Sequence, residues 1–428
     1  MKRLRAFGRA VEGAVSVPGS KSIANRALAI AALAGGQSTV RGLPDGDDTT
    51  AMLRALAGLG IACETAADGS TTVAGRGGAF SPVTERVHAA LAGTTSRFVT
   101  ALAALADRPV VVDGDAPLRA RPMRALHGAL GSLGATLTYE EGEGRLPVQV
   151  AGPLRQGGSV VLRGDVSSQF VSALMMIGPC LGGGLRIELS SPLVSVPYVE
   201  LTARVMADFG VPGVEVTADS IIVPEGRYVA REYDVEPDAS SASYPLAIAA
   251  VCGGTVTIPG LTMLSPQGDM AFASLLARMG CDVLHGVDGI GIRRSLDDPL
   301  LGVDADMADV SDLVPTLAVV GAVASTPTTI RGVGFIRAKE SDRLGDLAAE
   351  LGKLGAAVTV TDDGLHIEPV GGGAAGLHGA MLDTHHDHRL AMAFAVLGTV
   401  VDGIEVADPD VVSKSWPGFW SAYDSLVA

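Results

Sequence analysis

Six copies of one helical pattern divide the chain at nearly even intervals, and this repeat limits the possible fold more than any other feature. Each copy has a polar or charged entry, an alanine-rich run, a glycine or turn, and a β-rich segment. Successive runs start 71 to 75 residues apart, at Asn25, Ser96, Ser168, Ser243, Val314 and His388. Because this spacing exceeds that of most solenoid units, the pattern predicts a repeated supersecondary module.

A second, amphipathic helical run follows most of these copies. Each second run ends at a glycine that is followed by β-branched residues, as expected at a helix C-terminus. Turns such as Asp68-Gly69 and Asp363-Gly364 then predict hairpins. The first helix of each module is apolar on all sides and should be buried. The sequence therefore predicts an α/β fold built from helix–strand–helix–hairpin modules.

The length of 428 residues favours two domains, and six modules divide into three plus three. The apolar pattern breaks and charge rises at 231–238. We therefore expect one lobe at 19–233 and a second formed by 1–18 with 234–428, completed by the N-terminal strand. A cleft between two such lobes would be a usual place for a ligand.

Charge and hydropathy exclude several functions. The formal net charge is −15, which disfavours general binding to nucleic acid or to an anionic membrane. The longest apolar runs, such as Leu390–Val401, fall short of the ~20 residues that cross a bilayer. The N-terminus lacks the apolar run of a signal peptide, so we expect a cytoplasmic protein. The cysteines lie far apart and should be reduced thiols: Cys63, Cys180, Cys252 and Cys281.

In the segment Ile336–Leu344, I-R-A-K-E-S-D-R-L, five of the nine residues are charged. It follows a strand-like run and precedes a helical pattern. Free N–H groups at a helix start favour anions, so cations beside Glu340 indicate a site that binds an anion and moves a proton. A solvated helix start with local ion pairs remains an alternative.

Other helix entries carry phosphate-binding residue types. Lys21 and Arg26 lie among serines after a glycine, without a P-loop pattern, although capping serines beside a surface lysine would look similar. Gly93 would let a ligand approach the backbone. Arg119 and Arg121 precede a helix and could bind an anion bidentately.

In the second half, Asp312 precedes a buried helix, where it is either an N-cap or a general base. The run His385–Arg389 invites a metal interpretation, which is disfavoured because no complementary ligands accompany it. Cations recur at helix entries and loops of this acidic chain, and this placement indicates two anionic substrates. The cations are Lys21, Arg26, Arg121, Lys339, Arg343, Arg389 and Lys414.

Several motifs together resemble those of the 5-enolpyruvylshikimate-3-phosphate (EPSP) synthase family. They are, in order, S-K-S-x-x-N-R-A-L, A-G-T-x-x-R, D-V-S-S-Q-F, D-A-S-S-A-S-Y, K-E-S-D-R-L, D-H-R-x-A-M and S-K-S-W-P-x-F. The resemblance implies two lobes, each of three βαβαββ units around buried helices, like an α/β barrel turned inside out. It also implies transfer of the enolpyruvyl group of phosphoenolpyruvate to the 5-hydroxyl of shikimate 3-phosphate, by a monomer without metal or cofactor.

The resemblance also implies roles for individual residues. Asp312 would take the 5-hydroxyl proton, with Lys21 as an alternative, and Glu340 would protonate the methylene carbon. Shikimate 3-phosphate would be bound by Lys21, Ser22, Arg26, Ser167, Ser168, Gln169, Ser195, Tyr198, Asp312 and Lys339. Phosphoenolpyruvate would be bound by Lys21, Gly93, Arg121, Gln169, Arg343, Arg389 and Lys414.

Two positions depart from the family pattern, since Leu91 and Phe335 stand where asparagine is frequent. These departures bear on affinity and inhibitor sensitivity more than on the reaction. The nearest alternative is the sister enolpyruvyl transferase that acts on UDP-N-acetylglucosamine, which is not expected to carry D-V-S-S-Q-F or K-E-S-D-R-L. A repeat protein that binds phosphate without catalysis is the non-enzyme alternative.

Overall fold

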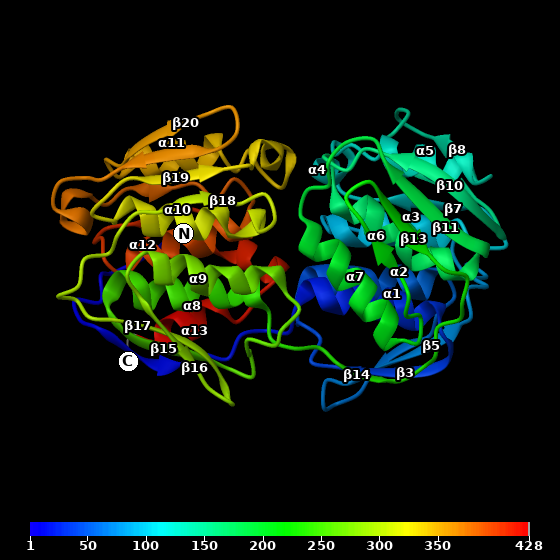
Figure 1. Cartoon of the computed structure of the whole chain (residues 1–428), viewed down its shortest axis with the longest axis horizontal. Helices are drawn as coiled ribbons and strands as arrows, with labels where there is room; N and C mark the ends of the chain where they lie inside the picture. Colours follow the sequence, from blue (N-terminus) through cyan, green and yellow to red (C-terminus); the bar gives the residue numbers. More distant parts are fainter. Residues whose placement is uncertain (427–428) are drawn as a thin grey trace. The chain divides into compact units, whose positions relative to one another are not determined.

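The computed structural model describes residues 1–426, and the chain in it divides into two compact units (Figure 1). Unit 1 comprises Met1–Pro18 and Glu236–Ala428, and unit 2 comprises Gly19–Val235. The chain therefore passes from unit 1 to unit 2 after Pro18 and returns after Val235.

Three buried helices that pack against one another form the centre of unit 2. They are α1 (Lys21–Leu33), α3 (Gly93–Ala103) and α6 (Ser168–Ile177). Most of their buried residues are small or aliphatic, with Phe98 and Phe170 as the aromatic exceptions, and polar residues are concentrated in their first turns. The remaining helices of the unit are α2 (Asp47–Gly58), α4 (Ala116–Arg119), α5 (Arg124–Ser132) and α7 (Val196–Asp208).

Three four-stranded sheets complete unit 2. Their orders are β14-β3-β5-β4, β6-β7-β9-β8 and β10-β11-β13-β12. In each sheet the first two strands are parallel and the others antiparallel. The strands are β3 (Gly35–Arg41), β4 (Cys63–Thr65), β5 (Thr71–Arg76), β6 (Arg86–His88), β7 (Val110–Asp113), β8 (Thr136–Tyr139), β9 (Val148–Ala151), β10 (Gln156–Leu162), β11 (Gly182–Leu189), β12 (Glu215–Val216), β13 (Ser220–Val223) and β14 (Glu232–Asp234).

Unit 1 repeats this plan. Its central helices are α8 (Ala239–Cys252), α10 (Val314–Ala322) and α12 (His388–Gly398), in which every residue is buried and which pack against one another. The amphipathic helices are α9 (Ala271–Arg278), α11 (Gly345–Lys353) and α13 (Phe419–Ser425). Each amphipathic helix turns its apolar face to the core because the opposite face is polar.

The sheets of unit 1 have the orders β16-β17-β15-β2, β18-β19-β21-β20 and β1-β23-β22. The strand β2, from the N-terminus, pairs in parallel with β15 and so joins a sheet of unit 1. The strands are β1 (Lys2–Arg3), β2 (Val11–Ala14), β15 (Gly254–Pro259), β16 (Asp282–His285), β17 (Gly289–Arg294), β18 (Asp304–Asp306), β19 (Thr328–Arg331), β20 (Ala357–Val360), β21 (Leu365–Glu368), β22 (Met381–Leu382) and β23 (Glu405–Val406).

The structure confirms the predicted α/β repeat and its buried helices. The turns Asp68-Gly69 and Asp363-Gly364 connect antiparallel strands, as predicted. The four cysteines are free thiols; two are buried and two partly buried. In residues 1–426, no helix combines the length and the apolar character needed to span a bilayer.

The charged segment Ile336–Leu344 differs in detail from its predicted form. A 3-10 helix at Gly334–Ala338 ends before Lys339, and α11 begins only at Gly345. Asp342 accepts hydrogen bonds from the backbone N–H groups of Leu344 and Gly345, so it satisfies donors at the start of α11. The residues between these helices form a loop, which leaves Lys339, Glu340 and Arg343 to make long-range contacts.

Candidate active site

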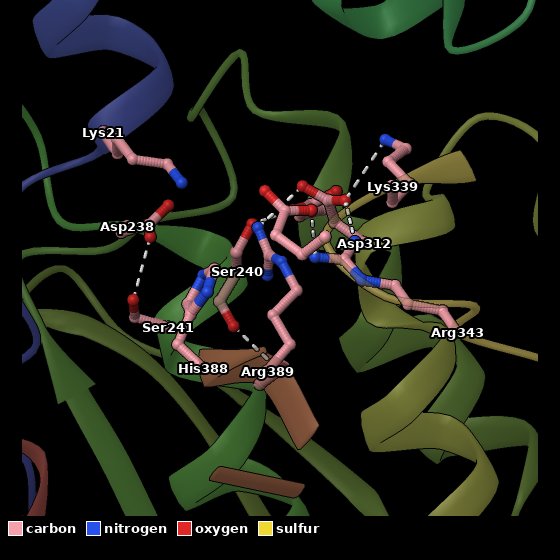
Figure 2. A network of polar contacts seen from close by, with 12 residues as sticks. Lys21, Asp238, Ser240, Ser241, Asp312, Lys339, Arg343, His388 and Arg389 are labelled. Carbon is pink, nitrogen blue, oxygen red and sulfur yellow. Dashed lines mark hydrogen bonds and ion pairs between the residues drawn. The ribbon is translucent and has the colours of Figure 1, made fainter. Parts of the chain in front are cut away.

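A network of ion pairs in unit 1 is centred on Asp312 (Figure 2). Asp312 lies in the 3-10 turn Ser311–Leu313 that precedes α10. Its carboxylate is 2.9 Å from Nη1 of Arg343, 2.6 Å from Nη2 of Arg389 and 3.5 Å from Nζ of Lys339. Since these cations come from three other positions in the chain, tertiary structure and not local helix capping determines where the Asp312 side chain points.

Arg343 connects three carboxylates. Its side chain is only 1% exposed, and its guanidinium also contacts Oε2 of Glu340 at 2.9 Å and Oδ2 of Asp387 at 2.7 Å. Asp387 is fully buried and is the N-cap of α12, where it accepts the backbone N–H of Arg389 at 2.9 Å. One carboxylate thereby positions Arg343 and the start of the helix that carries Arg389.

Glu340 is the second acid of the network. Its Oε1 is 2.9 Å from Nζ of Lys414, which belongs to the 3-10 helix Pro409–Lys414. Glu340 and Asp312 therefore share the guanidinium of Arg343, and each contacts further cations. Two carboxylates with separate partners beside a common guanidinium are suited to act as separate acid and base.

The pKa values in this network follow from burial and charge. Burial alone would raise the pKa of Asp312, but attraction by Arg389, Lys339 and Arg343 outweighs it and holds the pKa well below its usual range. Burial opposes the charge of Arg343, but attraction by Asp387, Glu340 and Asp312 raises its pKa above the usual value. The structure thus has Asp312 ionised and Arg343 charged at neutral pH.

Internal pairing nearly neutralises the network. Four cations, Lys339, Arg343, Arg389 and Lys414, contact three carboxylates, Asp312, Glu340 and Asp387. The balance among these groups is one positive charge. An anion that binds to the same guanidinium groups must therefore compete with Asp312 and Glu340.

Unit 2 contains a buried cation with a different set of partners. Arg26, on α1, donates to the hydroxyls of Thr202 and Ser172 and to the carbonyls of Tyr198 and Ser22. Burial lowers the pKa of Arg26 to about 10. These acceptors are neutral, so Arg26 keeps a charge that an anionic ligand could balance.

The first residue of α1 and the start of α3 carry the other cations of unit 2. Lys21 pairs with the buried carboxylate of Asp48 at 3.1 Å. Gly93 lies beside two guanidinium groups, because a Cβ at this position would be 2.8 Å from Nη1 of Arg97 and 3.0 Å from Nη1 of Arg121. The absence of a side chain at Gly93 therefore keeps both guanidinium groups next to the backbone.

The neutral residues predicted for unit 2 also lie at helix N-termini. Ser167 is the N-cap of α6 and accepts the backbone N–H of Gln169, while Ser168 is the first residue of that helix. Ser195 precedes α7 in a left-handed conformation with φ of 56°. A non-glycine residue in this conformation is strained, which often accompanies a functional position. Tyr198 lies in the first turn of α7.

Several contacts of the candidate site were not predicted from the sequence. Asp387 and Arg97 were parts of recognised motifs but received no role, and Asp48, Ser172 and Thr202 were not singled out. Asp48 gave no sequence signal, because its partner Lys21 is 27 positions away. Arg119, considered as an anion ligand, instead pairs with Asp113 and Glu141. In residues 1–426 no group of three or more His, Cys, Asp or Glu side chains could hold a metal ion.

Comparison with known proteins gives the family. The family model for EPSP synthase (3-phosphoshikimate 1-carboxyvinyltransferase) matches residues 6–422. The chain belongs to the EPSP synthase family. It is 42% identical over 414 residues to the 3-phosphoshikimate 1-carboxyvinyltransferase of Methanoculleus marisnigri, covering 96% of both chains. It is 39% identical to that of a Nostoc species, covering 99% of this chain and 98% of the relative.

A solved EPSP synthase has the same fold. The structure of EPSP synthase from Acinetobacter baumannii matches with a TM-score of 0.83 at 26% identity, over 99% of this chain and 97% of the other. The resemblance drawn from the motifs is therefore confirmed, and with it the class of enolpyruvyl transferases that use shikimate 3-phosphate. The alternative that acts on UDP-N-acetylglucosamine is not favoured.

Proposed function

We propose that the network around Asp312, Glu340 and Arg343 binds phosphoenolpyruvate and carries the proton transfers of the family's reaction. The chain transfers the enolpyruvyl group of phosphoenolpyruvate to the 5-hydroxyl of shikimate 3-phosphate and releases phosphate. The observation that carries the proposal is the contact of Arg343 with both candidate proton-transfer groups, Asp312 and Glu340, at 2.9 Å.

Phosphoenolpyruvate would bind by replacing internal partners. Its phosphate and carboxylate are acceptors for Arg343, Arg389 and Lys414, which now contact Asp312 and Glu340. As these cations turn to the substrate, Asp312 loses the attraction that holds its pKa low. The same exchange makes protonation of Glu340 easier, so substrate binding prepares both groups.

Glu340 would then act as the acid and Asp312 as the base. The proton of Glu340 moves to the methylene carbon of phosphoenolpyruvate, and the 5-hydroxyl oxygen attacks the adjacent enol carbon. Asp312 accepts the proton of that hydroxyl, which gives a tetrahedral adduct that still carries the phosphate. Glu340 next removes a methyl proton, the carbon–oxygen bond to phosphate breaks, and the enolpyruvyl product forms. The cations stabilise the charge that develops on the departing phosphate.

Residues of unit 2 would bind the other substrate. Arg26 retains an unbalanced buried charge, and the N-terminal residues of α6 and α7 supply hydroxyl and amide groups. We assign shikimate 3-phosphate to Ser22, Arg26, Ser167, Ser168, Gln169, Ser195 and Tyr198, together with Lys21, Asp312 and Lys339. Gly93 and Arg121, with Lys21 and Gln169, complete the set for phosphoenolpyruvate. We also propose a monomeric, cytoplasmic enzyme, which sedimentation and cell fractionation can test.

The test is phosphate release measured with phosphoenolpyruvate and shikimate 3-phosphate, in the wild type and in Arg389→Lys. Arg389 presents a planar guanidinium to Asp312, and lysine cannot reproduce its paired donors. We expect KM for phosphoenolpyruvate to rise about 10- to 100-fold, the effect of losing a charge-assisted hydrogen bond. KM for shikimate 3-phosphate should stay within about threefold of the wild-type value.

The matched control is Arg293→Lys, which makes the same exchange at an exposed arginine that pairs with Asp282. This control should leave both KM values unchanged. No phosphate release from the wild type with both substrates would refute the function. Equal KM values in Arg389→Lys and Arg293→Lys would refute the assignment of Arg389.

A further inference from the structure

A buried carboxylate on α11, Glu350, lies outside the proposed machinery and holds the loop that carries Asp387. Its side chain is 3% exposed. Oε2 accepts from Nζ of Lys353 at 2.6 Å and from the backbone N–H of Asp383 at 3.0 Å, and Oε1 is 2.9 Å from Nε2 of His385. A buried carboxylate is costly unless it is paired and hydrogen-bonded, so these partners account for its burial.

The loop that Glu350 holds is strained. His385 and His386 both have left-handed backbones, with φ of 48° and 57°. A non-glycine residue in this conformation is strained and persists only where its surroundings hold it. The backbone N–H of His385 donates to Asp383 at 2.8 Å, and its ring lies between Glu350 and Asp346. Glu350 therefore contacts both ends of the strained turn, at Asp383 and at His385.

The next residue after this turn is the one that orients Arg343. The backbone N–H of Asp387 donates to the carbonyl of Thr384 at 2.8 Å, which closes the turn. Its carboxylate then contacts Nε of Arg343 at 2.7 Å and caps α12. Because Asp387 follows the strained residues directly, the conformation of His385 and His386 determines where its carboxylate lies.

We propose that Glu350 and His385 are positioning residues for phosphoenolpyruvate binding, acting through Asp387 on Arg343. Neither residue touches the substrate in this scheme. Loss of the Glu350–His385 contact would let the turn relax, which would move the Asp387 carboxylate and weaken its hold on Arg343. Because Arg343 is assigned to phosphoenolpyruvate, the proposal rests on the proposed function of the network.

The test compares His385→Asn with His386→Asn. Asparagine tolerates the left-handed conformation, so both variants keep the backbone geometry, and only the first removes the contact with Glu350. His386 is the matched control because it has the same conformation and an 86% exposed side chain. We expect KM for phosphoenolpyruvate to rise about tenfold in His385→Asn, the usual effect of removing an indirect supporting contact. KM for shikimate 3-phosphate should change less than about twofold, and His386→Asn should match the wild type.

Glu350→Gln provides a second variant, since glutamine keeps the shape and loses the charge. The double variant that combines Glu350→Gln and His385→Asn should raise KM for phosphoenolpyruvate no further than the larger of the two single effects, because both substitutions remove the same contact. Equal KM values for phosphoenolpyruvate in His385→Asn and His386→Asn would overturn the proposal. A rise by the same factor in the KM values for both substrates in His385→Asn would overturn it as well. Failure of the proposed function is distinguishable, because the wild type itself would then release no phosphate.

Discussion

Replacement of Asp312 by asparagine should separate substrate binding from chemistry. Asp312 is the proposed base, and it is also the internal anion that contacts Arg343, Arg389 and Lys339. Asparagine keeps the size of the side chain but removes both the charge and the ability to accept a proton as a carboxylate. One change should therefore slow turnover and, at the same time, free cations for phosphoenolpyruvate.

The charges of the network give the magnitudes. The four cations and three carboxylates sum to one positive charge, which becomes two when the charge of Asp312 is removed. At an effective dielectric constant of about 20, a unit charge about 6 Å away contributes about 3 kcal/mol. If rearrangement of Lys339 and solvent offsets about half of this, phosphoenolpyruvate should bind about tenfold more tightly. Loss of the general base should reduce kcat by about 10²- to 10⁴-fold.

The variant should still fold. Arg343 keeps its contacts with Asp387 and Glu340, while Arg389 loses its ion pair with Asp312. We expect the free energy of unfolding to fall by about 1–3 kcal/mol, the usual cost of an unmade buried hydrogen bond. Thermal unfolding in the presence and absence of substrates would verify that the protein assayed is folded.

Calorimetric titration and steady-state phosphate release are the assays. Titration of the variant and of the wild type with phosphoenolpyruvate alone, so that no turnover occurs, should give a Kd for the variant at or below that of the wild type. Phosphate release at saturating substrates should give the reduced kcat. A tenfold weaker affinity for phosphoenolpyruvate with normal kcat would refute the reasoning. It would mean that Asp312 holds the cations in place for the substrate and does not compete with the substrate for them.

Two further changes test other parts of the structure. Gly93→Ala should raise KM for phosphoenolpyruvate about tenfold or more, because the new Cβ would lie 2.8 Å from Nη1 of Arg97 and 3.0 Å from Nη1 of Arg121. Steady-state kinetics would measure this rise, and an unchanged KM would contradict the prediction. Burial chiefly raises the pKa of Asp269 to about 6. Because the folded-state pKa exceeds the unfolded value near 3.8, about 3 kcal/mol of stability present at low pH is lost as pH rises through 6. Asp269→Asn should therefore raise Tm at pH 7.5 more than at pH 4.5, whereas equal changes at both pH values would contradict the assignment.

The sequence predicts the repeat because the features that define it are local. A helix such as α8 is apolar on every side over consecutive residues, and a turn such as Asp363-Gly364 carries its own conformational preference. Strand partners such as β2 and β15 are separated by about 240 residues, so periodicity alone does not identify them. The extent of the 3-10 helix before Lys339 was missed for a related reason: the pattern of α11 does not show where its first turn begins.

In the candidate site, too, local features could be predicted from the sequence and long-range pairs could not. Lys339, Glu340 and Arg343 are neighbours in the chain, so their joint chemistry is visible in the sequence. Arg343 and Asp387 are 44 positions apart, and His385 is 35 positions from Glu350. Pairing over such separations depends on how the fold brings the segments before and within α11 to the turn before α12, which no local pattern encodes. The sequence therefore indicated the cations, Glu340 and Asp312, but not the contact by which Asp387 positions Arg343.

The near-neutral balance of the network has a physical cause that also bears on mechanism. Arg343 and Arg389 are buried, and an unpaired buried charge costs several kcal/mol. In this network, internal carboxylates offset that cost by pairing with the buried cations. Asp312 and Glu340 provide that balance, and in the proposed mechanism a substrate that displaced them would leave each with a higher affinity for a proton. Stability of the free protein and preparation of the acid and base thus depend on the same contacts, so a variant that strengthens the internal pairs should bind phosphoenolpyruvate more weakly.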